Sequence, residues 1–405
     1  MRKSPFKRYL ALLLSLIAGY LISAAILNTS VDPYGYIRAP WAWDTVFDDY
    51  RDVTPATRIG KAAIANQGHW TAAIFGSSRM EMGVSTNHED LRSYNTANLA
   101  MPAAFLNEVI PAIDYTLNRN PDLELVIMGF EVGDLSSKRD LRAITNFYQS
   151  PFADNNKSIE RLINSTVGWT SFEESIETIK RYLNEIDPVR NRYGYNTKPK
   201  DPLNIRRQTE LGFRMNIYDP PQPYGKWGPI SEEKRPSDLI QQLLELLIRM
   251  RREGIEVHIL LPPVHALKLI HPETSMPESI AWEHEILILM ELCEQANAIT
   301  EAGPQIQLWS FLTFNEYTTE PMPNLSKESQ RLKNWFDLGH SRKYVGQSFT
   351  SVVMNDKKDN DIGVELLSSY WSTYKKVWLE AHAKYYKSAR EDISWYLNAG
   401  GSGGY

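Results

Sequence analysis

Five short strand-like segments, separated by helical patterns, constrain the fold of this 405-residue chain more than any other feature. They lie at about residues 72–76, 93–102, 124–130, 255–261 and 306–311. The run at 124–130 is almost unbroken in its apolar character, as expected of a strand with both sheet faces covered. Between the second and third runs, residues 105–118 carry apolar side chains at helical spacing. This alternation predicts an α/β fold with helices flanking a parallel sheet.

The first run ends in Gly-Ser-Ser-Arg at residues 76–79, where a buried strand gives way to a tight turn. The carboxyl end of such a strand is where α/β enzymes present nucleophiles and gather ligands. A serine needs a base, usually a histidine oriented by a carboxylate, and Asp337 and His340 offer that pair. We therefore predict Ser78 as nucleophile, His340 as base and Asp337 as the residue that orients it. A turn serine and a helix-capping pair are the alternatives.

An uncharged run from Tyr9 to Leu27 follows Arg2, Lys3, Lys7 and Arg8 and is about as long as a membrane-spanning helix. The charges before it place the amino terminus in the cytoplasm and the main domain in the periplasm or outside the cell. A cleaved signal peptide is the alternative, although its apolar core is usually shorter and no clear cleavage site follows.

These patterns predict the organisation of the whole chain. We expect a cytoplasmic tail over residues 1–8, a single inner- or plasma-membrane anchor over 9–27, a juxtamembrane segment over 28–60, a main domain over 61–356 with an insertion at about 136–235, and a helix and flexible tail over 357–405. The insertion is expected to cover one edge of the sheet. The aromatic residues of the last helix, about 364–397, indicate packing more than a glycan-binding platform.

Composition excludes several classes of function. A net charge of −5 argues against a nucleic-acid-binding protein, which would show a basic face. The single cysteine, Cys293, excludes an intrachain disulfide and a CxxC metal site. The histidines show no grouping such as HExxH, so we expect neither a metal nor another cofactor.

Together these blocks resemble the SGNH hydrolase superfamily. The resemblance implies a flavodoxin-like, three-layer fold, with Ser78 as nucleophile and Asp337 and His340 as its paired residues. Asn98-Leu99-Ala100 matches the second block, so the amides of Ser78 and Ala100 are implied as the oxyanion hole. The layout is similar to a membrane-anchored branch that includes the alginate O-acetylation proteins and the D-alanyl transfer protein of teichoic acid synthesis.

The third block of that family, Gly-x-Asn-Asp, has no counterpart here. The equivalent strand runs Gly129-Phe130-Glu131-Val132, so a side-chain amide donor is missing. Loss of one oxyanion donor slows such a reaction on the order of a hundredfold or more. That departure favours a slow, dedicated transferase over a general esterase.

Four residues near the expected edge of the sheet are candidates for substrate contacts: Arg79, Asn98, Glu131 and His265. Arg79 would bind a carboxylate or phosphate, or would pair with a structural acid. Glu131, like Asp134, would contact a glycan or would act as a loop or cap residue. His265 would line the cleft or would be a structural histidine in a proline-rich turn. Arg206, in the insertion, would contact an anionic polymer or lie on a solvated basic face.

The resulting hypothesis is O-acyl transfer, first of all acetyl transfer, onto a cell-envelope or secreted polysaccharide. By resemblance, a multi-spanning membrane-bound O-acyltransferase would deliver the activated acyl group across the bilayer. Two alternatives stay open. One is a carbohydrate esterase with the same three residues, and the other is a catalytically silent assembly or glycan-binding subunit of a polysaccharide export system.

Overall fold

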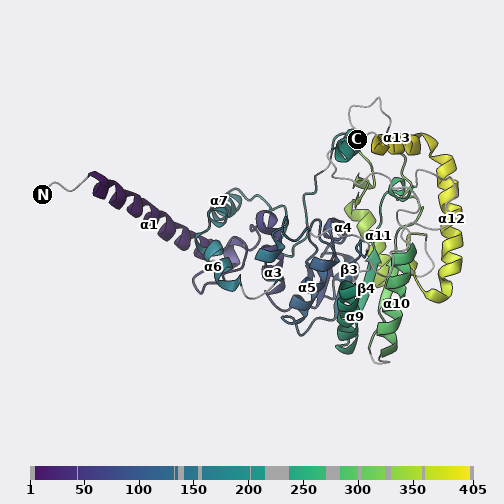
Figure 1. Ribbon diagram of the computed structural model, residues 1–405, viewed down its shortest axis with the longest axis horizontal. Helices are drawn as coiled ribbons and strands as arrows, with labels where there is room; N and C mark the ends of the chain where they lie inside the picture. Colours follow the sequence, from purple (N-terminus) through teal and green to yellow (C-terminus); the bar gives the residue numbers. More distant parts are fainter. Residues whose placement is uncertain are drawn as a thin grey trace. The chain divides into compact units, whose positions relative to one another are not determined.

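The computed structural model describes residues 5–42, 44–131, 133–135, 141–153, 157–200, 202–214, 237–270, 283–299, 303–323, 330–357 and 361–401 (Figure 1). The chain divides into two compact units. The first unit comprises Met1–Gly68 and Arg142–Lys198, and the second comprises His69–Leu141 and Pro199–Tyr405. The expected insertion is thus shared between the two units, because residues 142–198 group with the amino-terminal segment.

The second unit is built on a six-stranded sheet of order β2-β1-β3-β4-β5-β8. The first five strands pair in parallel, and β8 pairs antiparallel with β5 at the edge. Their bounds are β1 (Ala72–Phe75), β2 (Thr96–Asn98), β3 (Leu125–Gly129), β4 (Glu256–Leu261), β5 (Gln307–Ser310) and β8 (Val364–Glu365). The order 2-1-3-4-5 is the flavodoxin-like order. The predicted α/β fold with a parallel sheet is therefore confirmed.

Helices lie on both faces of this sheet. Helices α4 (Ser78–Gly83) and α11 (Lys343–Met354) pack together over one face, where Ile74, Trp309 and Phe349 belong to one buried core. The other face is covered by α5 (Leu106–Leu117), α9 (Ser237–Arg252) and α10 (Glu283–Ile299). Helix α9 contacts both α5 and α10. Covered faces explain why β1 and β3 carry apolar residues along their length.

The end of the chain differs from the single helix predicted over 364–397. It forms strand β8, then α12 (Trp371–Ser388) and α13 (Arg390–Gly401). Tyr374 and Trp378 are buried, and their polar atoms contact Ser310 Oγ at 3.1 Å and the Leu312 carbonyl at 2.7 Å. The expectation that aromatic residues of this helix serve packing is confirmed for these two.

The first unit is helical in its described part. Its longer helices are α1 (Pro5–Val31), α3 (Thr57–Ala65), α6 (Ser158–Val167) and α7 (Trp169–Leu183), with the short α2 (Asp44–Phe47) between α1 and α3. Within α1, the segment Phe6–Val31 is long and apolar enough to be a membrane anchor or a signal sequence. Helices α6 and α7 pack against α1 and against each other.

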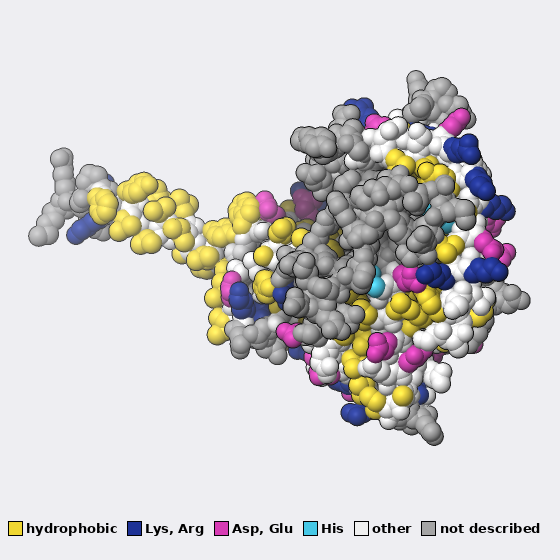
Figure 2. Space-filling view, turned by 45° about the vertical axis from the view of Figure 1, so that its right-hand side comes forward, with side chains coloured by type: hydrophobic (Ala, Val, Ile, Leu, Met, Phe, Trp, Pro, Cys, Tyr) yellow, Lys and Arg dark blue, Asp and Glu magenta, His cyan; other side chains and the backbone are white. Residues whose placement is uncertain are grey.

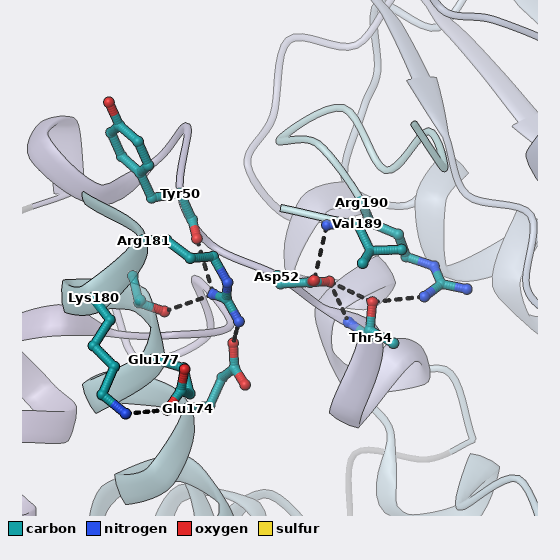
Figure 3. A network of polar contacts seen from close by, with 10 residues as sticks. Tyr50, Asp52, Thr54, Glu174, Glu177, Lys180, Arg181, Val189 and Arg190 are labelled. Carbon is teal, nitrogen blue, oxygen red and sulfur yellow. Dashed lines mark hydrogen bonds and ion pairs between the residues drawn. The ribbon is translucent and has the colours of Figure 1, made fainter. Parts of the chain in front are cut away.

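Polar contacts tie α7 to the segment that follows α1 (Figure 3). Arg181 Nη1 donates to the Tyr50 carbonyl at 3.0 Å. The Asp52 carboxylate accepts the backbone N–H of Thr54 and of Val189, each at 2.9 Å. The first unit is therefore held together by specific contacts between residues far apart in sequence.

Candidate active site

The turn after β1 sets the position of the predicted nucleophile. Gly76 adopts φ +130°, a conformation that favours glycine, and an added Cβ there would lie 2.7 Å from Met80 Cγ. Ser77 then caps α4, since its Oγ accepts the Arg79 N–H at 3.2 Å. Ser78 is the first helical residue and is half-buried at the carboxyl end of the parallel strands.

Asp337 and His340 lie on a two-stranded hairpin of β6 (Trp335–Asp337) and β7 (His340–Ser341). The two residues are directly paired in its register. Trp335 and Leu338 are buried in a core cluster, which fixes the hairpin from one side. On the other side β7 contacts α4, so the hairpin is held against the helix that carries Ser78.

An unbroken chain of hydrogen bonds joins the three predicted residues. Ser78 Oγ lies 2.8 Å from His340 Nε2, and His340 Nδ1 lies 2.8 Å from Asp337 Oδ2. Asp337 Oδ1 also accepts the backbone N–H of Gly339 at 2.7 Å and of His340 at 3.0 Å. The structure therefore brings together residues that are 262 positions apart in sequence, in the arrangement that a serine nucleophile needs.

The surroundings of Asp337 keep its carboxyl group ionised. Burial raises the pKa of this group, but the charge and hydrogen bond of His340, the Gly339 N–H and the charge of Lys268 outweigh burial and lower the pKa to about 2. An ionised carboxylate favours a proton on His340 Nδ1, which leaves Nε2 free to accept the Ser78 proton.

The two predicted oxyanion donors are in different situations. Among the described residues, the Ser78 amide has no hydrogen-bond partner. The Ala100 amide is buried and donates to Asn98 Oδ1 at 3.2 Å. In this arrangement Ser78 offers a donor beside its own hydroxyl, whereas the amide of Ala100 is already occupied.

Asn98 does not face a substrate, which corrects one of the predicted contacts. Its side chain is fully buried, and Nδ2 donates to the carbonyls of Met80 at 3.2 Å and Val84 at 2.9 Å. The Val84 carbonyl directly follows α4, where acceptors lack partners within the helix, whereas the Met80 carbonyl also accepts the Val84 N–H at 3.1 Å. Asn98 therefore joins the end of β2 to the helix that begins with Ser78.

Arg79 and Glu131 contact each other in this structure. Arg79 Nη1 lies 2.5 Å from Glu131 Oε2, and Glu131 Oε1 accepts the hydroxyl proton of Ser77. For Arg79 the structure thus contains the acid pairing that was the alternative to substrate binding. The Glu131 carboxylate links the turn before Ser78 to the residues that follow β3, and both of its oxygens have protein partners.

His265 is a second correction, because it lines no cleft. It is fully buried, Nε2 lies 2.7 Å from the Glu320 carbonyl, and Nδ1 accepts the Leu267 N–H at 3.2 Å. Burial lowers the pKa of this imidazole to about 4, so it is neutral at ordinary pH.

Two other polar candidates, Arg206 and Asp134, are also buried within the fold. Arg206 pairs with Asp392 at 2.7 Å and is mostly buried, so it does not lie on a solvated basic face. Asp134 is buried, and burial together with the charge of Glu131 raises the pKa of its carboxyl well above the usual range. Neither residue is placed to contact a polymer.

Lys268 is a neighbour of the site that the sequence did not indicate. A Cβ added to Gly339 would lie 3.7 Å from Lys268 Nζ and 3.9 Å from Arg79 Nε, so two cations flank the turn between Asp337 and His340. Only the fold brings residue 268 to this turn. No group of three or more potential metal ligands occurs among the residues the structure describes.

No protein-family model, curated protein or solved structure matches this chain. The geometry of the site is a serine, a histidine and a carboxylate in hydrogen-bond sequence at the carboxyl edge of a parallel sheet, where such folds bind their ligands.

Proposed function

We propose that this chain is a membrane-anchored O-acyltransferase of the SGNH type, which forms an acyl ester on Ser78 and passes it to a polysaccharide hydroxyl outside the cytoplasm. The observation that supports this best is the continuous chain from Ser78 Oγ through His340 to Asp337. Acetyl is the simplest acyl group for the reaction.

In the first half-reaction, Ser78 Oγ attacks the acyl carbon of an ester or thioester while His340 Nε2 takes the hydroxyl proton. The Ser78 amide is placed to stabilise the oxyanion, and His340 then returns the proton to the leaving group. In the second half-reaction, His340 deprotonates an acceptor hydroxyl, which attacks the acyl-serine and restores Ser78. With water as acceptor, the same steps give an esterase.

The first unit supports retention of α1 as an anchor. Ala24, Asn28 and Val31 of α1 are fully buried in the described structure, and Asn28 contacts α6 and α7. Cleavage after the apolar run would remove part of this packing. The described residues contain one candidate span. We propose that the multi-spanning acyltransferase partner supplies the activated acyl groups.

The position of Glu131 favours transfer over rapid hydrolysis. A carboxylate stands where the related hydrolases carry an amide donor, and the Ala100 amide is engaged by Asn98. A site with fewer available oxyanion donors stabilises the tetrahedral state less. We therefore expect slow acylation by simple esters and slow loss of the acyl group to water.

The test is intact-mass spectrometry of the full chain in detergent after incubation with p-nitrophenyl acetate. We expect one added acetyl group, abolished in Ser78→Ala and His340→Ala and retained in Ser93→Ala, which removes an exposed serine of the same unit. In Asp337→Asn the acylation rate should fall by roughly 10³- to 10⁴-fold, because the wrong tautomer of His340 is favoured.

Acceptors then separate the alternatives. Cello-oligosaccharide and oligogalacturonate are added to the acetylated protein, and the acetyl group is followed to sugar or to water. Transfer to either sugar supports the proposal. Release only to water favours the esterase, and a wild-type chain that gains no mass and turns over no ester favours the silent subunit.

A further inference from the structure

Helix α6 presents a stripe of apolar side chains outward, beside the exposed Glu160 and Asn164, and buries two of its polar side chains. Ile159, Leu162 and Ile163 are 73%, 49% and 54% exposed, whereas Arg161 and Ser165 are 3% and 6% exposed. A surface helix in water normally has the opposite arrangement. The outward stripe therefore needs an apolar environment.

This helix lies beside the apolar helix α1. The hydroxyl of Tyr20 donates to the Val167 carbonyl at 3.2 Å, and its ring packs against Trp169 and Phe172 at centroid distances of 5.9 and 5.8 Å. The corner between α6 and α7 is closed at Gly168, where a Cβ would lie 2.2 Å from the Asn164 carbonyl oxygen. Figure 2 shows hydrophobic side chains continuing from α1 onto the part of the first unit at its base.

The length of α1 sets where a bilayer would end. From Tyr9, the first residue after the charged terminus, to Tyr20 the helix rises only about 17 Å at 1.5 Å per residue. A hydrocarbon core is about 30 Å thick, so a bilayer spanned by α1 must continue beyond the level of Tyr20. Ile22 and Ile26, which follow Tyr20 in α1, are 61% and 63% exposed, so the helix has apolar surface beyond that level.

Two exposed tryptophans lie near the same end of α1. Trp169, at the corner, is 60% exposed, and Trp41 is 63% exposed with its Nε1 donating to Thr29 Oγ1 at 3.1 Å. Tryptophan is enriched where the hydrocarbon core meets the headgroups, because its ring is apolar and its N–H is polar.

We propose that α6 and the α6–α7 corner lie in the outer interface of the bilayer, with the stripe of Ile159, Leu162 and Ile163 and the ring of Trp169 inserted among the lipids. We expect lipid, and not a protein, to cover the stripe. The stripe adjoins α1, and a bilayer spanned by α1 must extend beyond the level of Tyr20. An amphipathic helix in this position binds through its buried apolar area. The inference rests on the proposed anchoring by α1 and is independent of the acyl chemistry.

The test uses the full chain in phosphatidylcholine liposomes, in a background with Cys293→Ala. Bimane is attached at Ile163→Cys, at Glu177→Cys on α7 and at Leu14→Cys within α1. The side chain of Glu177 is 50% exposed and lies beyond the corner, which makes it the matched aqueous control. Acyl-chain nitroxide lipids should cause a loss of emission at positions 163 and 14, and aqueous iodide should cause it at position 177.

Each other outcome is distinct. Iodide quenching at 163 with lipid quenching at 14 overturns the interfacial placement and keeps the anchor. Iodide quenching at all three positions contradicts the anchor itself. Protection of position 163 from both quenchers shows a protein on the stripe, and this also overturns the proposal.

Discussion

At the scale of single residues, Asp337 shows how surroundings select one protonation state. Burial alone would favour the neutral carboxyl group, yet two backbone N–H groups, the ring of His340 and the nearby Lys268 reverse that preference and lower its pKa to about 2. The carboxylate therefore stays charged at any pH at which a neutral imidazole can act as a base. It also makes folding stability depend on pH.

The pKa of Asp337 falls from the ordinary 3.8 to about 2 on folding, so its ionised form stabilises the fold at pH values above about 4. That stability is lost as the pH falls through about 2. At neutral pH we expect Asp337→Asn to lower the free energy of unfolding by about 2 kcal/mol, and we expect this difference to shrink between pH 4 and pH 2. Urea unfolding across this range measures it.

Asp122→Asn, which changes an exposed aspartate of the same unit, is the control and should show no such trend. A difference between wild type and Asp337→Asn that stays constant from pH 7 to pH 2 would contradict the assigned role.

The sequence was sufficient to select Ser78, Asp337 and His340 because a strand end and a short Asp-x-x-His spacing are local signals. It was not sufficient for Asn98 and His265. Both are polar residues beside strand ends, as substrate contacts often are. Their burial and partners depend on how α4 and the Glu320 segment pack, which a linear pattern does not record.

At the scale of elements, α4 is a short helix held from several sides. Gly346 of α11 lets the two helices approach closely, since a Cβ there would lie 1.8 Å from the Gly83 carbonyl oxygen. Asn98 joins the end of α4 to β2. A six-residue helix has little stability of its own, so such contacts determine where Ser78 lies.

Asn98→Ala should therefore destabilise the second unit and displace Ser78. It leaves the buried carbonyl of Val84 and the amide of Ala100 without this partner, at a cost of about 1–3 kcal/mol for each group left unsatisfied, whereas the Met80 carbonyl keeps the Val84 N–H. Asn87→Ala, at an exposed residue between α4 and the same strand, is the matched control.

Thermal unfolding and the acetylation rate of Ser78 are the measurements for this pair of variants. Equal unfolding temperatures for the two would show that Asn98 does not hold α4. A slower acetylation in Asn98→Ala, measured well below its unfolding temperature, would identify it as a positioning residue.

The predicted strands agree with the structure because strands covered on both faces, such as β1 and β3, carry apolar residues at every position. The secondary structure of the carboxyl-terminal region was harder to predict. Its periodicity indicated one helix, yet residues 364–365 pair with the free edge of β5. Gly363 permits this, since a Cβ there would lie 2.3 Å from Phe311 Cε1. Whether a segment pairs at the edge of a sheet depends on which strand has a free edge. The free edge exists only once the sheet has assembled, so a local sequence pattern does not reveal it.

At the scale of the whole molecule, α1 belongs to two environments. Its first half is exposed along its length, whereas Ala24, Asn28 and Val31 are buried within the first unit. Hydropathy treats residues 9–27 as one apolar run and does not reveal this difference. The partners of that second half lie about 140 residues later in the chain, so only the tertiary structure shows that part of the apparent anchor is also core.

Two truncated chains, compared in the same detergent, separate these roles. One begins at Gly19 and keeps Tyr20 and Ala24, and the other begins at Asn28 and loses both. The shorter chain should lose about 2 kcal/mol or more of stability in the first unit, because it removes an aromatic contact with Trp169 and a buried side chain. Faster proteolysis between residues 157 and 183 would report that loss.

All described contacts of Ser78, His340 and Asp337 lie in the second unit, so both truncated chains should acetylate Ser78 at the full-length rate. This readout separates damage to the first unit from general misfolding. Equal proteolysis of the two chains would mean that residues 19–27 of α1 add no stability to the first unit. Protection in the longer chain alone would mean that residues 19–27, which belong to the apolar segment long enough to span a membrane, also stabilise the core of the first unit.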